Sequence, residues 1–299
     1  MTINKTISFQ GWPGANSDNA SREAFPGCPT VSCTSFEETM AAVHARHADI
    51  AMIPIENSLA GRVADIHHLL PNSGLHITGE HFHRVRHQLL GLKGASLDGL
   101  KSVHSHVHAL NQCRSMIARL GLEKHVHADT AGAAEMIAKQ GDPTQAAIAS
   151  SLAAEIYELE VLASDVEDAE HNTTRFITME REPRVPALDS VPTITSIVFQ
   201  VRSVPAALFK ALGGFATNGV NITKLESYLV GGGFVAAQFY ADIEGHPDDP
   251  PVERALEELS FFTTDRRVLG TYAASPFRED PAIYGVLDPD PYKRKLSIV

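Results

Sequence analysis

Four clusters of polar residues are the first candidates for chemistry in this 299-residue sequence: residues 10–17, 54–58, 105–112 and 129–135. Each follows a short apolar run that predicts a strand and precedes a stretch with helical periodicity. Taken singly, each cluster also fits an ordinary helix cap or turn. Together they would bring Ser, Thr and Asn side chains, backbone N–H groups and positive helix ends into one region, which favours a small anion such as a carboxylate or phosphate.

A fifth stretch, His171 to Phe176, is not explained by turn or capping rules. It lies between acidic residues 167–170 and an apolar strand predicted over residues 176–179. From residue chemistry alone, a turn with an ordinary surface arginine and a binding site are equally good interpretations.

The elements predicted up to about residue 180 are those of parallel α/β units, because short apolar runs alternate with amphipathic helices. Residues 50–53 and 146–149 are continuous apolar runs, typical of strands that are covered on both faces. Ser35 and Glu38 predict a capping box. One helix is predicted over the periodic residues 110–120, before Gly121. In open parallel sheets ligands bind beyond the carboxyl ends of the strands, where the polar clusters lie.

The pattern changes after a linker predicted at residues 181–193, which is rich in proline. The following segments predict strand 195–203, helix 206–218, strands 222–230 and 234–244 joined by Gly231-Gly232-Gly233, helix 251–262 and strand 267–274. This β-α-β-β-α-β order is the split βαβ arrangement. A tail over residues 277–299 is predicted to be irregular.

Composition excludes several classes of partner. Lys and Arg number 25 against 36 Asp and Glu, giving a formal net charge of −11. Such a charge disfavours nucleic acid and anionic membrane surfaces as partners. The sequence also has no apolar run long enough for a signal peptide or a membrane span, so we expect a cytoplasmic protein.

Metal binding is also disfavoured. The three cysteines are an odd number without C-x-x-C spacing. Among the 15 histidines, His104, His106 and His108 would share one face of a strand. No neighbouring Cys or Asp completes a ligand set, so the sequence predicts no metal site.

Several motifs resemble those of one enzyme family. Asn172-Thr173-Thr174-Arg175-Phe176 resembles the N-x-T-R-F motif of prephenate dehydratases, and residues 9–17, 53–61, 103–113 and 129–134 match further motifs of that family in order. The C-terminal region resembles an ACT regulatory domain, with residues 220–227 at the expected place. Departures from the family pattern are Asn16 for a tyrosine, Val107 for a proline, Tyr228-Leu229 for Arg-Pro and Ala206-Ala207 for Gly-Ala.

The resemblance covers residues 6–276 and implies a fold and an activity. The fold would be a two-lobed catalytic domain of parallel sheets, similar to periplasmic binding proteins, over residues 1–180, and a ferredoxin-like ACT domain over 194–276. The activity would be conversion of prephenate to phenylpyruvate, water and carbon dioxide, without a cofactor. L-Phenylalanine would be the allosteric effector, and the protein would form a homodimer or homotetramer. Nothing before Ile7 suggests a fused chorismate mutase, so a monofunctional enzyme is expected.

Roles for single residues follow from the same resemblance. Thr174 would donate a hydrogen bond or proton to the departing hydroxyl, and Arg175 would be the counter-charge for a carboxylate. Glu135 would be either a general acid or a solvated helix carboxylate. The predicted substrate contacts are Asn57, Ser105, Gln112, Thr130, Thr173 and Phe176. The predicted effector contacts are Asn218, Gly219, Val220, Asn221, Ile222, Glu226 and Ser227.

Two alternatives stay open. One is a dehydratase that acts on arogenate, the amino derivative of prephenate, and yields phenylalanine directly. The other is a non-enzymatic sensor protein that binds a small anion, because two α/β lobes with a cleft also describe binding modules.

Overall fold

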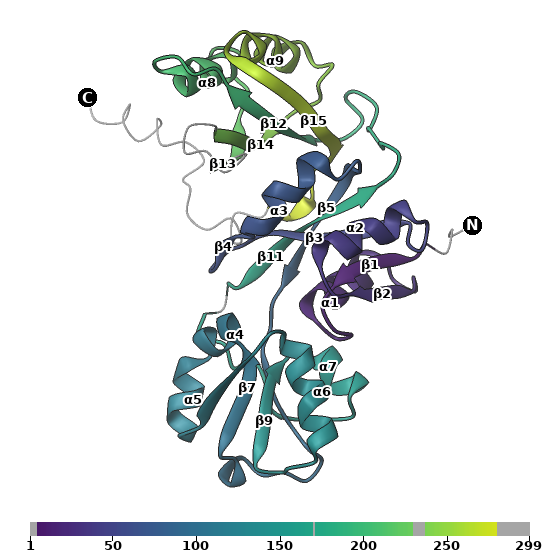
Figure 1. Ribbon diagram of the computed structural model, residues 1–299, viewed down its shortest axis with the longest axis vertical. Coiled ribbons are helices and arrows are strands. Elements are labelled where there is room, and N and C mark those ends of the chain that lie inside the picture. Colours follow the sequence, from purple (N-terminus) through teal and green to yellow (C-terminus); the bar gives the residue numbers. More distant parts are fainter. Residues whose placement is uncertain (1–4, 170, 230–236, 280–299) are drawn as a thin grey trace.

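The computed structural model describes residues 5–169, 171–229 and 237–279. Figure 1 shows a lower α/β lobe, a central α/β lobe and an upper C-terminal domain, stacked along the long axis. The chain enters the lower lobe between residues 84 and 88 and returns to the central lobe between residues 163 and 173. The two lobes are therefore joined by two crossings of the chain.

The central lobe is built on a sheet of order β2-β1-β3-β11-β5, with β4 paired to β3. Its elements are β1 (Ile7–Gln10), α1 (Asn16–Ala24), β2 (Thr30–Cys33), α2 (Phe36–His44), β3 (Ile50–Asn57), β4 (Gly61–Arg62), α3 (Ala64–Leu69), η1 (Leu70–Asn72), β5 (His76–Arg84) and β11 (Thr173–Glu180). β1 is parallel to β2 and β3, but β11 is antiparallel to both β3 and β5. The sheet is mixed, not parallel as predicted, because β11 comes back from the lower lobe and inserts between two earlier strands.

The lower lobe has a second mixed sheet, of order β10-β6-β9-β7-β8. Its elements are β6 (Gln88–Gly91), η2 (Leu97–Gly99), β7 (Ser102–His106), α4 (Val107–Gln112), α5 (Arg114–Leu120), β8 (Glu123–His127), α6 (Thr130–Gln140), β9 (Gln145–Ala149), α7 (Ser151–Ile156) and β10 (Glu160–Ala163). The single helix predicted over residues 110–120 is wrong, because a non-helical Cys113 separates α4 from α5.

Local capping signals confirm several predicted boundaries. The backbone N–H of Glu38 donates to the Ser35 hydroxyl at the start of α2, as in the predicted capping box. Gly121 and Gly141 adopt the left-handed conformation at the ends of α5 and α6, with φ of 64° and 69°. Three of the polar clusters lie at strand-to-helix junctions, whereas residues 54–58 end β3 and lead into β4.

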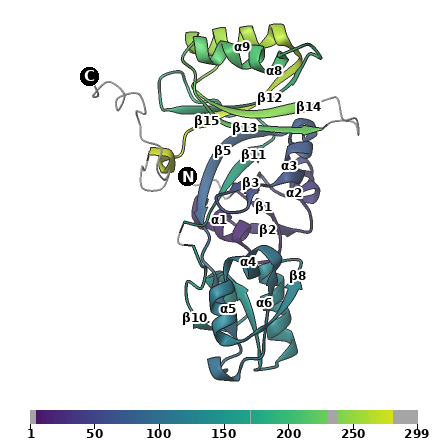
Figure 2. The same cartoon turned by 90° about the vertical axis from the view of Figure 1, so that its left-hand side faces the viewer.

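The C-terminal domain has the predicted β-α-β-β-α-β order. Its elements are β12 (Thr193–Val201), α8 (Ala207–Thr217), β13 (Ile222–Leu229), β14 (Ala237–Glu244), α9 (Pro250–Phe262), β15 (Thr263–Ala273) and η3 (Pro276–Glu279). The antiparallel sheet has the order β13-β14-β12-β15, and Figure 2 shows α8 and α9 on one face of it. Residues 181–192, where the linker is predicted, form no helix or strand. The predicted connection at 231–233 and the tail beyond 279 lie outside the described residues.

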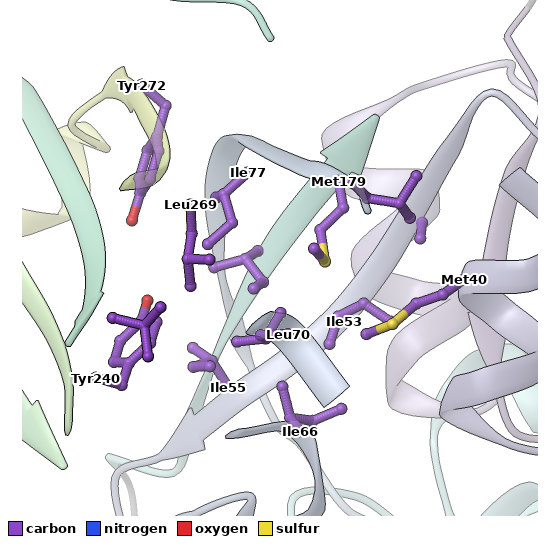
Figure 3. Close-up of a cluster of buried hydrophobic side chains, with 14 of the residues drawn as sticks. Met40, Ile53, Ile55, Ile66, Leu70, Ile77, Met179, Tyr240, Leu269 and Tyr272 are labelled. Atoms are coloured by element: carbon purple, nitrogen blue, oxygen red, sulfur yellow. The ribbon is translucent and has the colours of Figure 1, made fainter. Parts of the chain in front are cut away.

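The other face of this sheet packs on the central lobe. Tyr240, Leu269 and Tyr272 join one apolar cluster with residues of β3, α3, η1 and β5 (Figure 3). A Cβ at Gly270 would lie 2.0 Å from the carbonyl oxygen of Ile77, so the two parts of the chain are in close contact. The chain's own central lobe therefore covers this face of the sheet. No helix within the described ranges is long and apolar enough to span a membrane.

Candidate functional site

A cavity of about 480 Å³ lies between the two lobes. Four of the predicted substrate or catalytic residues line it: Asn57 and Thr174 from the central lobe, and Gln112 and Thr130 from the lower lobe. Another cavity of about 460 Å³ lies between the linker and the C-terminal domain. None of the predicted catalytic or substrate-binding residues lines that second cavity, so the interlobe cavity is the candidate site.

Asn57 holds the hydroxyl of Thr174 at this site. The Asn57 carboxamide oxygen accepts from the backbone N–H groups of Leu59 and Ala60, at 3.0 and 2.8 Å, which fixes the orientation of the side chain. Its Nδ2 then donates to Thr174 Oγ1 at 2.9 Å. Within the described part of the chain no acceptor lies within hydrogen-bonding distance of the Thr174 hydroxyl proton. The hydroxyl is therefore oriented as an acceptor toward Asn57 and can donate to a ligand.

A chain of hydrogen bonds extends from Asn57 to the lower lobe. Asn57 Nδ2 donates to Asn172 Oδ1 at 2.8 Å, and Asn172 Nδ2 donates to Gln112 Oε1 at 2.9 Å. The same Gln112 oxygen is 2.9 Å from His87 Nε2. Since an amide oxygen can only accept, His87 carries its proton on Nε2. Burial lowers the pKa of His87, which keeps this imidazole neutral near pH 7.

This chain leaves the Gln112 carboxamide nitrogen available. Both acceptor positions of its oxygen are used, and no acceptor for Nε2 is present among the residues with a described structure. Two N–H groups on the cavity wall suit a carboxylate. His87 belongs to none of the polar clusters predicted from the sequence, and only its contact with Gln112 shows its role.

Two helix N-termini also face the cavity. Asn16 is the first residue of the nine-residue α1, and Thr130 is the first residue of the eleven-residue α6. Asp129 caps α6 by accepting from the backbone N–H of Gly132 at 2.9 Å. The aligned peptide dipoles make each N-terminus partly positive, so the cavity favours anions without a buried lysine or arginine.

Arg62 supplies a cation at the cavity wall that sequence analysis missed. It follows Gly61 of the 53–61 motif directly, and its side chain is 43% exposed. Its Nη1 donates to the carbonyl oxygen of Ser227 at 2.8 Å and lies 3.5 Å from the Glu226 carboxylate. The side chain of Arg62 thus lies between the cavity and the C-terminal domain.

Arg175 does not face the cavity, so the prediction that it binds a substrate carboxylate is wrong. Neighbouring residues of a strand point to opposite faces, and Arg175 points away from Thr174 toward the C-terminal domain. It is 3% exposed and donates to Glu80 at 2.7 Å, Glu56 at 2.9 Å and Asp242 at 2.6 Å. Burial disfavours its charge, but the surrounding acidic groups and Tyr272 hold the pKa of Arg175 well above its usual value.

Four further predicted residues do not line the cavity. Ser105 is fully buried and donates to the carbonyl oxygen of Ile148 at 2.6 Å, and Phe176 is part of the core of the central lobe. Thr173 binds Ser58 through its backbone. Glu135 accepts from Trp12 Nε1 at 3.2 Å and pairs with Lys139 at 3.0 Å, which favours the helix-carboxylate interpretation over a general acid. These residues shape the walls, and the structure gives none of them a polar atom in the cavity.

The predicted effector residues form a turn and a strand of the C-terminal domain. Gly219 has φ +70° in the turn between α8 and β13, and Asn218 Nδ2 donates to the carbonyl oxygen of Gly214 and to Glu258. Val220 is buried, Asn221 is exposed and Ile222 begins β13. Glu226 pairs with Lys224 at 3.2 Å. Ser227 lies beside it, where Arg62 reaches its carbonyl oxygen.

Histidines gather in the lower lobe without forming a metal site. His104 stacks on His125 at 4.6 Å between ring centroids and lies 3.3 Å from His127. Within residues 5–169, 171–229 and 237–279, no group of three or more His, Cys, Asp or Glu side chains is placed to hold a metal ion.

Comparison with known proteins decides the family. The sequence profile described as prephenate dehydratase matches residues 7–184, more than half of the chain. The chain belongs to the prephenate dehydratase family. The match includes the cavity residues of both lobes and the buried Arg175, so the interlobe cavity lies within the family's own domain.

Relatives of this family extend the similarity over the C-terminal domain. A bifunctional N-acyl-homoserine lactone acylase/prephenate dehydratase of Komagataeibacter europaeus is 52% identical over 281 residues, covering 94% of this chain and all of that protein. Arogenate dehydratase 2 of Petunia hybrida is 40% identical over 280 residues, covering 89% of this chain and 71% of that protein.

Two solved structures resemble the whole chain. A structure described as GqqA, a novel type of quorum quenching acylase, has a TM-score of 0.87 at 52% identity and covers 92% of this chain and all of its own. A prephenate dehydratase of Arthrobacter aurescens in complex with L-Phe has a TM-score of 0.83 at 29% identity, with coverage of 95% and 93%. Both coverages extend beyond residues 7–184, the region that the prephenate dehydratase profile matches.

Proposed function

We propose that this protein catalyses the decarboxylating dehydration of prephenate to phenylpyruvate, a step of phenylalanine biosynthesis. The observation that carries the proposal is the Thr174 hydroxyl, which Asn57 holds in the interlobe cavity with its proton available to a ligand. In this reaction the ring carboxylate leaves as carbon dioxide. The electron pair of the broken C–C bond aromatises the ring and expels the C4 hydroxyl, which takes up a proton and departs as water.

Thr174 assists at the departing oxygen. A threonine hydroxyl is a very weak acid, so it stabilises the departing oxygen by a hydrogen bond more readily than by full proton transfer. Hydrogen bonding from Asn57 to Thr174 Oγ1 polarises the hydroxyl and fixes its direction. Pre-aligned donors of this kind act where charge develops in the transition state.

The two carboxylates of prephenate need donors, and the cavity provides neutral ones. Gln112 Nε2, the N-terminus of α6 at Thr130 and the N-terminus of α1 at Asn16 line it from different sides. Arg62 supplies one cation on the wall. In this proposal these groups replace Arg175 as the partners of the carboxylates, and they orient the ring so that its C4 hydroxyl meets Thr174.

Arogenate is the alternative substrate, supported by plant relatives named arogenate dehydratases. It differs from prephenate by an amino group in place of the keto oxygen. Asp65 lines the same cavity and is an acidic partner for such a group. The purified protein should therefore be incubated separately with each substrate. We expect phenylpyruvate and carbon dioxide in equal amounts from prephenate. Conversion of arogenate to phenylalanine, with no phenylpyruvate formed from prephenate, would contradict this choice.

An acylase activity is a second candidate, because the 52% identical relative carries a bifunctional name. The expectation of a monofunctional enzyme therefore needs an assay of its own. Incubation with an N-acyl-homoserine lactone, followed by detection of free fatty acid, decides it. Release of fatty acid by wild-type protein, and its persistence after Thr174→Val, would show a second activity with different requirements.

We further propose that the C-terminal domain is an ACT domain that binds L-phenylalanine at the turn from Asn218 to Ile222, with Glu226 and Ser227 nearby. Its support is the βαββαβ topology and the L-Phe complex of the Arthrobacter aurescens relative. The edge strands β13 and β15 offer surfaces for a homodimer or homotetramer. As a biosynthetic enzyme, the protein would act in the cytoplasm.

Calorimetry tests the effector proposal. We expect L-phenylalanine to bind the full-length protein and to change its affinity for substrate, and linkage requires substrate to change the affinity for phenylalanine by the same factor. No heat of binding at millimolar phenylalanine would leave the domain without this ligand. Sedimentation of a stable monomer at micromolar concentration would remove the oligomer proposal.

A further inference from the structure

Two residues of the interlobe cleft, Asn57 and Thr174, lie on the strands β3 and β11. The C-terminal domain contacts both strands on the opposite face. Asp242 of β14 binds Arg175, the residue after Thr174, at 2.6 Å. Lys224 of β13 binds Glu56, the residue before Asn57, at 2.8 Å. Each cleft residue is therefore one peptide unit away from a side chain that the C-terminal domain holds.

These contacts are buried and directional. Asp242 is fully buried and also accepts from the hydroxyls of Ser196 and Tyr240. Burial alone would raise the pKa of Asp242, but Arg175, Ser196 and Tyr240 together lower it below its usual range. The carboxylate is therefore ionised at neutral pH, and its charge-assisted bonds fix the guanidinium more tightly than neutral bonds would.

Strand pairing by itself leaves this end of the sheet irregular. Arg175 lies opposite Glu56, but the next residue, Phe176, lies opposite Pro54, so the register shifts between them. A bulge interrupts the ladder and redirects the side chains next to it. Asn57 and Thr174 pair just beyond this irregularity, and β5 holds the other side of β11 in continuous register there, so the side-chain contacts of Arg175 and Glu56 add to the strand pairing.

We propose that Asp242 and Lys224 are positioning residues for the reaction in the cleft, acting through Arg175 and Glu56 on Thr174 and Asn57. The proposal rests on the proposed dehydratase function. It gives the C-terminal domain a part in basal turnover that requires no effector.

The first test is the kinetics of Asp242→Asn in the full-length protein. Misplacement by about 1 Å can cost on the order of 100-fold in rate. We expect kcat to fall by roughly 10- to 100-fold with KM little changed, because Thr174 acts at the departing oxygen. An unchanged kcat in a folded Asp242→Asn protein would overturn the proposal.

Thr195→Val is the matched control. Thr195 is fully buried in the same domain, and its hydroxyl binds the carbonyl oxygen of Gly245 at 2.8 Å and the Thr271 hydroxyl at 3.1 Å. It precedes Ser196 in β12, so its side chain points to the opposite face of the sheet, away from Asp242. This variant weakens the C-terminal domain without touching Arg175 or Glu56, and its kcat should match the wild type. A kcat that falls as far as in Asp242→Asn would indicate general destabilisation and would overturn the proposal.

Hydrogen exchange supplies a readout that does not depend on turnover. Amides of residues 53–59 and 172–178 should exchange faster in Asp242→Asn and in the milder Lys224→Met than in wild type or Thr195→Val. Uniform exchange changes across the chain would overturn the inference. Wild-type protein that fails to convert prephenate would instead contradict the proposed function, and the exchange pattern would still decide the positioning role. If Asp242→Asn does not fold, Lys224→Met carries both measurements.

Discussion

The two faces of the β3–β11 strand pair differ sharply in chemistry. The cleft face carries Asn57 and Thr174, which are uncharged, half-buried and joined by a hydrogen bond. The back face carries Glu56 and Arg175, which are charged and packed against the C-terminal domain. The alternation of side chains along a strand places neighbours in sequence on these opposite faces.

The two faces therefore have different roles: the cleft face binds the substrate, and the back face supports the structure of the cleft. Amide N–H groups and helix N-termini can bind a dianionic substrate, and they need no counter-charge when the site is empty. A buried arginine needs its carboxylates at all times, because an unpaired buried charge is costly. Arg175 has three of them, Glu56, Glu80 and Asp242. It therefore supports the structure of the cleft without lining it.

The largest expected effect comes from removing the cation of the back face, Arg175. Arg175→Met would leave three carboxylates without their shared cation, and removing one partner of a buried ion pair typically costs about 3–5 kcal/mol. We expect the free energy of unfolding to fall by about that amount in urea titrations. Arg184→Met is the control, because Arg184 pairs with Glu180 while 58% exposed, and such a surface pair contributes at most about 1 kcal/mol. Equal losses in the two variants would contradict the support role.

The cleft face is best broken at Thr174. Thr174→Val keeps the shape of the side chain but removes the donor to the departing oxygen, and losing such a donor typically lowers kcat by about 100-fold or more. KM should change little, because the interaction forms mainly in the transition state. Thr178→Val, four residues along the same strand and roughly 13 Å away, should keep wild-type kcat. A Thr174→Val enzyme with wild-type kcat would remove Thr174 from the mechanism.

Gln112 tests whether neutral donors bind the carboxylates. A hydrogen bond to a charged group contributes about 1.5–3 kcal/mol, so Gln112→Ala should raise KM by about 10-fold or more. Initial-rate measurements over a range of prephenate concentrations check this. Gln145→Ala is the control, because Gln145 lies at the start of β9 and binds Asp142, away from the cleft. A KM that rises after Arg175→Met but not after Gln112→Ala would reverse the roles of the two faces.

The smallest expected effect concerns pH at the domain contact. His67 is 1% exposed between Tyr228 and Tyr240, and neither ring nitrogen has a partner within the described residues. Burial lowers the pKa of His67 to about 4, and the positive charge of Lys224 adds to this shift. The unfolded chain binds a proton near pH 6.5 but the folded protein does not, so stability is lost as pH falls from about 6.5 toward 4.

From pH 7 to pH 6 this single group should lower the free energy of unfolding by somewhat less than about 1 kcal/mol. His67→Phe should remove that share of the pH dependence. The exposed neighbour His68, whose ring also contacts Tyr228, provides the control as His68→Phe. Identical pH profiles for wild type and His67→Phe would show that His67 contributes nothing to the pH dependence.

Much of this fold follows from local sequence signals. Caps at Ser35, Gly121 and Gly141 act within a few residues, and the C-terminal β-α-β-β-α-β order appears at nearly the predicted boundaries. Asn57, Gln112, Thr130 and Thr174 line one cavity. Asn57 ends β3 and Thr174 lies at the start of β11 in the central lobe, whereas Gln112 ends α4 and Thr130 begins α6 in the lower lobe. The predicted strand-to-helix junctions account for Thr130 and for the cluster that contains Gln112, whereas Asn57 and Thr174 lie on the paired strands β3 and β11.

The errors arise where distant segments meet. Strand alternation already predicts that Thr174 and Arg175 face opposite sides, but only the docking of the C-terminal domain shows which side is buried. The antiparallel insertion of β11 depends on two crossings between the lobes and leaves no periodic signal in the sequence. Ser105 and Phe176 stand in motifs that also build the core, so motif membership alone does not separate contact with a ligand from packing.

The central claim is that the contacts of the back face hold the residues of the cleft face in place. Its most direct test is a double-mutant cycle on kcat with Thr174→Val and Asp242→Asn. If Asp242 acts through Thr174, its substitution should slow the wild-type enzyme but have little further effect in the Thr174→Val background. Wild type, both single variants and the double variant are compared under saturating prephenate. Independent effects, with the double variant slower by the product of the two single losses, would contradict the coupling of the two faces.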